Sequence, residues 1–178
     1  MAAMMLPSKM ILYFKDGKVQ SEIGTGAIFK TIIVTDKATE SGFQLLKIVN
    51  KKYILKLDSA GIQQNAYDIF KEVKVTATNE TKEIAGYVCK KALVETGTGK
   101  KFEVFYCPNL GPKAANWFNP YKEIDGMIME YHYKQYNLDM KFVAVKVTAD
   151  PVKDEFFVEP KGYEPITKEK MAEIFENF

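Results

Sequence analysis

The sequence contains no arginine: all 25 basic residues are lysine, in a chain of 178 residues with a formal net charge of +2. Arginine is the residue best suited to bidentate contacts with phosphate and guanine, so we expect no nucleic-acid partner. No apolar run approaches the roughly 18–20 residues that cross a bilayer. Any membrane association is therefore expected to be peripheral rather than membrane-spanning.

Residue types that carry catalysis or bind metals are scarce. The one histidine, His132, alternates with Glu130 and Lys134 on the polar side of an expected strand. The serines lie in no nucleophile motif, and two cysteines with one histidine do not give the spacing of a zinc site. We therefore expect no catalytic residues, no metal and no cofactor. An uncharacterised hydrolase that uses His132 is the minor enzymatic alternative.

The start of the chain lacks the basic and apolar segments of a signal peptide. Because other features below favour export, we expect the leader to be missing from this sequence. The first few residues are then expected to be a remnant of cloning or disordered.

Cys89 and Cys107 lie at equal distances from Thr98, the centre of a Gly-Thr-Gly turn. A three-residue hairpin loop with glycine at its last position would place the two cysteines opposite each other on neighbouring strands. Opposed residues of an antiparallel pair are about 4.5–5.5 Å apart at Cα, which a disulfide can bridge. We predict a disulfide and an oxidising compartment; two unrelated buried thiols are the alternative.

The dominant period of the apolar residues is two, which favours strands. A helix is expected at residues 62–73 and another at 167–178, where Thr167 is the predicted N-cap. The fold class is mainly β (α+β): a curved antiparallel meander sheet or half-barrel of about 9–10 strands, with the C-terminal helix packed on it. Residues 1–178 are expected to form one domain. The expected strands are 10–14, 19–23, 28–34, 43–49, 53–57, 74–78, 87–95, 101–107, 127–136 and 140–148.

A large apolar face is predicted along residues 127–136, because methionines and tyrosines alternate there with more polar residues. The strand at 101–107 adds Tyr106, and the loop at 108–120 adds Trp117 and Phe118. Core packing, with the aromatic side chains of the loop tucked in, is the favoured explanation of this face. If it forms a groove or cavity, methionine and aromatic side chains would suit varied apolar ligands. The candidate lining residues are Met127, Met129, Tyr131, Tyr133, Tyr106 and Trp117.

The segment at residues 80–92 contains Thr81-Lys82, Gly86-Tyr87 and Cys89-Lys90. It resembles the signature of a family of uncharacterised exported domains in Gram-negative cell envelopes. Such domains are similar in architecture to the LolA/LolB-like fold of periplasmic lipoprotein carriers. The resemblance implies an unclosed antiparallel barrel with helices over a hydrophobic cavity that holds acyl chains. The arginine on which the carriers partly depend has no counterpart here.

Two functions follow as expectations. The first is a non-catalytic, periplasmic or exported domain that binds a lipid or a lipoprotein acyl chain in a concave sheet face. The alternative is a structural or interaction module whose loop at 108–120 docks Trp117 and Phe118 onto an envelope protein.

Overall fold

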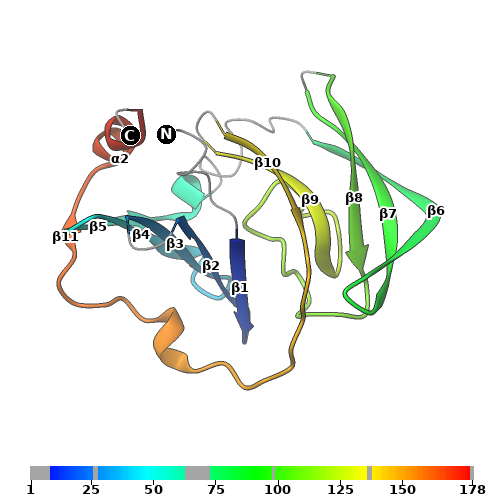
Figure 1. Cartoon of the computed structure of the whole chain (residues 1–178), viewed down its shortest axis with the longest axis horizontal. Helices are drawn as coiled ribbons and strands as arrows, with labels where there is room; N and C mark the ends of the chain where they lie inside the picture. The colour runs from blue at the N-terminus through cyan, green and yellow to red at the C-terminus, as the bar shows by residue number, and fades with distance from the viewer. Residues whose placement is uncertain (1–8, 26–27, 63–72, 98, 136–137, 177–178) are drawn as a thin grey trace. The chain divides into compact units, whose positions relative to one another are not determined.

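The structure is a computed structural model that describes residues 9–25, 28–62, 73–97, 99–135 and 138–176 (Figure 1). The chain divides into two compact units: the first comprises residues 1–62 and 152–178, and the second comprises residues 63–151. Each unit is built on one sheet.

The first unit contains a six-stranded sheet in which five consecutive strands form an antiparallel meander. A two-residue turn joins β1 to β2: Asp16 and Gly17 both have positive φ, 50° and 79°, as the primed turns of two-residue hairpins require. The sixth strand, β11, pairs with β5 in parallel. The order is β1 (Lys9–Lys15), β2 (Lys18–Thr25), β3 (Phe29–Asp36), β4 (Ser41–Ile48), β5 (Lys51–Leu57) and β11 (Glu164–Pro165).

The second unit contains a five-stranded antiparallel meander. The β7–β8 register pairs Lys90 with Tyr106 and Glu95 with Lys101, which is the register that the cysteine spacing predicted. The strands are β6 (Lys74–Ile84), β7 (Tyr87–Glu95), β8 (Lys101–Cys107), β9 (Met127–Gln135) and β10 (Leu138–Val143).

The C-terminal helix α2 (Lys168–Glu176) packs on the first sheet, as predicted, because Phe175 of the helix contacts Phe29 of β3. The Thr167 hydroxyl accepts a hydrogen bond from the Lys170 backbone N–H at 3.3 Å, which confirms the expected cap. Met171 is buried, and the Phe175 ring meets Phe29 edge-on with centroids 5.7 Å apart. A short 3-10 helix, η2 (Asp154–Phe157), precedes β11.

The prediction of one continuous curved sheet or half-barrel is wrong in its topology, although the mainly β class is confirmed. The structure has two sheets, and they do not close into a barrel. A helix begins directly after β5: residues 59–62 are helical, and the Asp58 carboxylate accepts a hydrogen bond from the Gly61 N–H at 2.7 Å. The edge of β5 is then occupied by β11, so β6 cannot extend that sheet. The remainder of the helix expected at 62–73 lies outside the described residues.

Candidate ligand-binding sites

The apolar face predicted along β9 is divided between two clusters on opposite sides of the second sheet. Met127 and Met129 pack with Phe105, whereas Tyr131 packs in the other cluster with Tyr106. Successive residues of a strand point to opposite faces, so Phe105 and Tyr106 belong to different sides of the sheet. The expected single lining surface is therefore not formed by these residues.

A β-bulge in β9 causes this division. Phe105 pairs with Glu130 and Tyr106 pairs with Ile128, so Met129 is an extra residue with no partner of its own in the ladder. One inserted residue changes the side on which the following residues lie. Glu130, which strict alternation placed on the polar surface, is consequently 3% exposed. Alternation of residue types gives no sign of the bulge.

The remaining predicted residues lie in different settings. Burial raises the pKa of the Tyr131 phenol above its usual range. The side chain of Tyr133 lies outside the described residues. Trp117 and Phe118 are half-buried in the loop at residues 108–126, and their ring centroids are 6.1 Å apart.

The buried carboxylate of Glu130 forms an ionic cluster with two half-exposed lysines, which the sequence did not predict. Its two carboxylate oxygens accept hydrogen bonds from the ammonium groups of Lys82 and Lys141, both at 2.6 Å. The Lys82 ammonium also lies 5.0 Å from the centroid of the Phe105 ring. Burial alone would raise the pKa of Glu130, but the two lysines outweigh burial and hold the pKa below its usual range. The two lysines therefore stabilise the ionised form of the buried Glu130 carboxylate.

Cys89 and Cys107 share one cluster with Met129, and both are buried free thiols in the structure. The predicted disulfide is therefore not formed here. The β7–β8 register, continued by one pair beyond Lys90 and Tyr106, sets the two cysteines opposite each other. The β7–β8 ladder ends at Lys90 and Tyr106, and Cys107 is followed by Pro108, which has no N–H to donate. Burial raises the pKa of the Cys89 thiol, and the neighbouring Cys107 raises it further.

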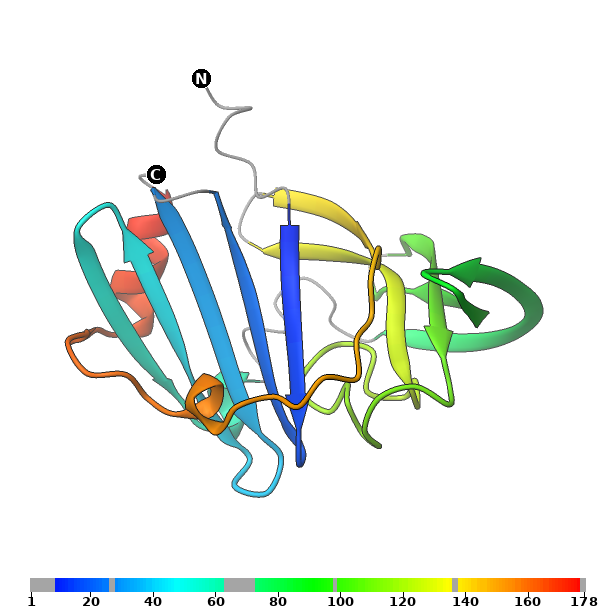
Figure 2. The same ribbon diagram turned by 60° about the horizontal axis from the view of Figure 1, so that its bottom comes forward.

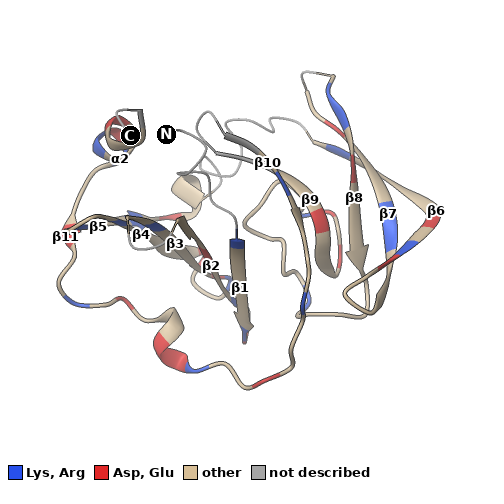
Figure 3. Cartoon of the chain, viewed as in Figure 1, with Lys and Arg blue, Asp and Glu red and all other residues tan. Residues whose placement is uncertain are grey.

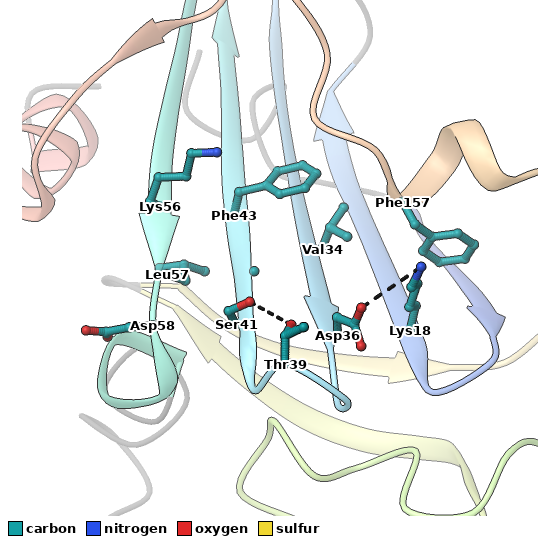
Figure 4. Close-up of a pocket in the computed structure, with 11 residues that line it drawn as sticks. Lys18, Val34, Asp36, Thr39, Ser41, Phe43, Lys56, Leu57, Asp58 and Phe157 are labelled. Carbon is teal, nitrogen blue, oxygen red and sulfur yellow. Dashed lines mark hydrogen bonds and ion pairs between the residues drawn. The ribbon is translucent and has the colours of Figure 1, made fainter.

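A pocket of about 450 Å³ lies on the first sheet, at the end where β3 turns into β4 (Figure 4). Its apolar part is formed by Val34 and Phe43 from neighbouring strands, by Leu57, and by Phe157 from η2. Polar and charged groups complete the lining. They are Lys18, Asp36, Thr39, Ser41, Lys56 and Asp58.

The segment at residues 152–163, which we call the strap, covers the face of the first sheet that carries Val34 and Phe43 (Figure 2). Its Phe156 ring stacks on Tyr13 with centroids 4.5 Å apart. Two acidic residues of the strap bind lysines of the sheet: Asp154 binds Lys15 at 2.7 Å, and Glu159 binds Lys56. The Lys15 ammonium lowers the pKa of Asp154.

Within the described residues, no three His, Cys, Asp or Glu side chains gather closely enough to hold a metal ion. Among the helices of the described chain, none has both the length and the apolar character needed to span a bilayer.

A mainly β chain of two meander sheets, with a pocket on one of them, defines a class of small β domains but no activity. The chain belongs to the DUF4412 family, a domain of unknown function, whose family model matches residues 1–117. That match includes the first meander and ends within the loop that follows β8. No curated protein and no solved structure matches the chain.

Proposed function

We propose that the protein is a non-catalytic domain of the bacterial cell envelope that binds a lipid-like ligand in the pocket of the first sheet. The pocket itself carries this proposal. Its volume of about 450 Å³ falls in the range of small-molecule sites, roughly 300–1,000 Å³. An apolar floor with a rim of lysines, acids and hydroxyls suits a molecule with one apolar chain and a polar head.

The ligand class is the one expected from the sequence, but the proposed position is different. The bulge at Met129 separates the methionines of β9 from Tyr131, whereas Val34 and Phe43 are direct partners in the β3–β4 register. Val34 and Phe43 are 3% and 9% exposed, because Phe157 packs against them, so they offer a ligand the floor of the pocket and no wider surface. We therefore place the apolar chain of the ligand against Val34 and Phe43.

The proposed location in the envelope rests on two features of the second unit. The segment at residues 80–92 resembles the signature of exported envelope domains. Cys89 and Cys107 oppose each other across a hairpin, where oxidation would join them. Fractionation of the source cells and a thiol assay on the native protein test this part of the proposal.

The pocket can be blocked without altering the apolar core. Thr39 is an exposed residue of the pocket rim, so Thr39→Trp would place an indole in the pocket. Asn109→Trp adds the same side chain to an exposed loop of the other unit and is the matched control. Titration with a dansyl-labelled long-chain fatty acid should show at least about tenfold weaker binding for Thr39→Trp. Equal binding by both variants, or none by the wild type across a lipid panel, would refute the proposal.

Native mass spectrometry of protein purified from its own cells would identify the ligand. A retained lipid would appear as extra mass in the wild type and would be absent or reduced in Thr39→Trp.

The second candidate function is an interaction module, favoured by the aromatic pair of the loop at residues 108–126. Asn116 fixes this loop, because its side-chain amide donates hydrogen bonds to the carbonyl oxygens of Ile124 at 2.8 Å and Gly126 at 3.0 Å. Trp117 and Phe118 retain partial exposure on this rigid support. Envelope proteins captured by the wild type should be lost with Trp117→Ala and Phe118→Ala together. An unchanged partner list would exclude this function.

A further inference from the structure

One end of the six-stranded sheet carries a row of lysines. Successive partners in the register of β1 to β5 lie on one face, because each residue stands directly opposite the next. With strands about 4.8 Å apart, the row extends over roughly 20 Å. Basic residues are visible at the start of β1 and over the β4–β5 end of the sheet (Figure 3). The row consists of Lys9, Gly24, Lys30, Lys47 and Lys52.

The lysines at the opposite end of the same face are neutralised, and those of the row are mostly not. At the pocket end, each lysine has an acidic partner: Lys15 with Asp154, Lys18 with Asp36, and Lys56 with Glu159. In the row, Lys30 binds Glu22 at 2.7 Å. Within the described chain, no carboxylate lies within ion-pair distance of Lys9, Lys47 or Lys52. The row therefore keeps an excess of positive charge.

Two exposed apolar side chains lie at this same end. Ile28 is 55% exposed and Val49 is 57% exposed. The Val49 N–H donates a hydrogen bond to the Ile28 carbonyl at 2.8 Å, so the two residues are adjacent. Val49 has φ of +51°, a left-handed conformation that is strained for a β-branched residue. The turn between β4 and β5 thus contains a solvent-exposed valine in a strained backbone conformation. Asparagine or glycine would adopt this conformation with less strain.

We propose that this end of the sheet docks on the surface of an anionic bilayer. The lysine row faces the phosphate groups of the lipids, while Ile28 and Val49 enter the interfacial layer. An ammonium group acts as a point charge and needs no bidentate geometry, so a lysine-only surface suits a field of phosphates. Apolar side chains beside basic ones are the pattern of proteins that lie on membranes. This proposal explains why a strained valine is exposed at this turn: on the membrane, the bilayer would cover the Val49 side chain.

Cosedimentation with vesicles tests the electrostatic part. The wild type should bind vesicles of phosphatidylglycerol and phosphatidylcholine, should release them at high salt, and should not bind phosphatidylcholine alone. Each lysine near an anionic surface contributes about a fivefold change in partitioning. The triple variant Lys9→Gln, Lys47→Gln, Lys52→Gln should therefore bind about 100-fold more weakly.

The matched control removes the same charge from the second unit, where Lys74, Lys90 and Lys100 are exposed. The triple variant with glutamine at these three positions should keep most of the binding. Equal losses in the two triple variants would overturn the proposal, because net charge and not the row would then be responsible. Binding to neutral vesicles, or to single-stranded DNA in preference to anionic vesicles, would overturn it as well.

Val49→Asn tests the apolar part with a readout that a structural role would not give. Asparagine tolerates the left-handed conformation, so the melting temperature should rise while vesicle binding weakens. Unchanged vesicle binding would remove Val49 from the docking surface. The docking surface is independent of the pocket: Thr39→Trp should leave vesicle binding unchanged, so failure of one proposal is distinguishable from failure of the other.

Discussion

The buried carboxylate of Glu130 gives a quantitative prediction about the second sheet. Glu130→Gln removes the charge from two hydrogen bonds, each worth about 1.5–3 kcal/mol when one partner is ionised. The net loss of stability is smaller than the sum of these two energies, because the side chains of Lys82 and Lys141 are 47% and 51% exposed and water can hydrate their ammonium groups. We expect Glu130→Gln to lower the free energy of unfolding by about 2 kcal/mol at pH 7.

Removing the two lysines instead should cost more. Lys82→Met with Lys141→Met leaves a carboxylate that is 3% exposed without a cation. A buried charge that loses its partners costs about 3–5 kcal/mol. Replacing all three residues, with Glu130→Leu added, should recover much of the stability, since apolar replacement of a whole buried ion pair is often neutral.

The wild type and the double-lysine variant should also respond to pH in opposite directions. In the wild type the lysines hold the pKa of Glu130 below its unfolded value of about 4.3. The stabilisation is therefore present above that unfolded value and is lost as pH falls through the folded pKa, so the difference from Glu130→Gln should shrink in acid. In the double-lysine variant only burial acts, which raises the folded pKa, so lowering the pH should restore stability.

Urea unfolding at several pH values measures both effects. If the two variants cost the same, and the wild type and the double-lysine variant follow the same pH dependence, then water, and not the two lysines, solvates the carboxylate. That result would refute the assignment of Glu130 to a buried ionic cluster.

Three further predictions concern the second unit and the strap. Oxidised protein should contain a Cys89–Cys107 disulfide that adds about 3 kcal/mol by closing a short loop; free thiols titrated after denaturation of the native-source protein would contradict it. Gly126→Ala should destabilise strongly, because a Cβ there would lie 2.4 Å from the Cys107 carbonyl oxygen, whereas Gly162→Ala should cost only the roughly 1–2 kcal/mol of a left-handed residue. Thermal unfolding of the two variants measures the difference, and equal shifts would contradict it. Asn116→Ala should leave two loop carbonyls without their donor and cost about 1–3 kcal/mol, which urea unfolding would detect; an unchanged midpoint would show that the loop needs no such support.

Local signals in the sequence predicted the hairpins well. Asp16-Gly17 and the Gly-Thr-Gly turn around Thr98 fix loop length and register with a few residues, so the strands on either side of each were placed within a few residues of their observed ends. Turn chemistry acts over such short distances that one sequence is enough to identify it.

Features that depend on distant residues were not predicted. The parallel strand β11 pairs with β5, from which it is separated by more than one hundred residues in the sequence. A strand of two residues is too short to produce a recognisable pattern of residue types. The bulge at Met129 is fixed by what β9 packs against, so strict alternation assigned Glu130 to the surface and grouped Met127 with Tyr131. Consequently, the candidate lining residues that the structure describes on β8 and β9 pack in apolar clusters, as apolar side chains should, but these clusters lie on two faces of the sheet and not on one.

Several residues of the segment at 80–92 have a structural explanation in the second sheet. Ala85 and Gly86 have φ of 51° and 82° and form the turn between β6 and β7. Lys82 binds the buried Glu130, and Cys89 lies in the cluster with Met129. Three residues of the segment therefore have a role in folding: Gly86 suits the left-handed turn, Lys82 pairs with the carboxylate of Glu130 on β9, and Cys89 is a small buried side chain of the core. A motif explained by folding gives no information about the ligand, so the ligand is better sought on the first sheet, which carries the pocket and the lysine row on one face.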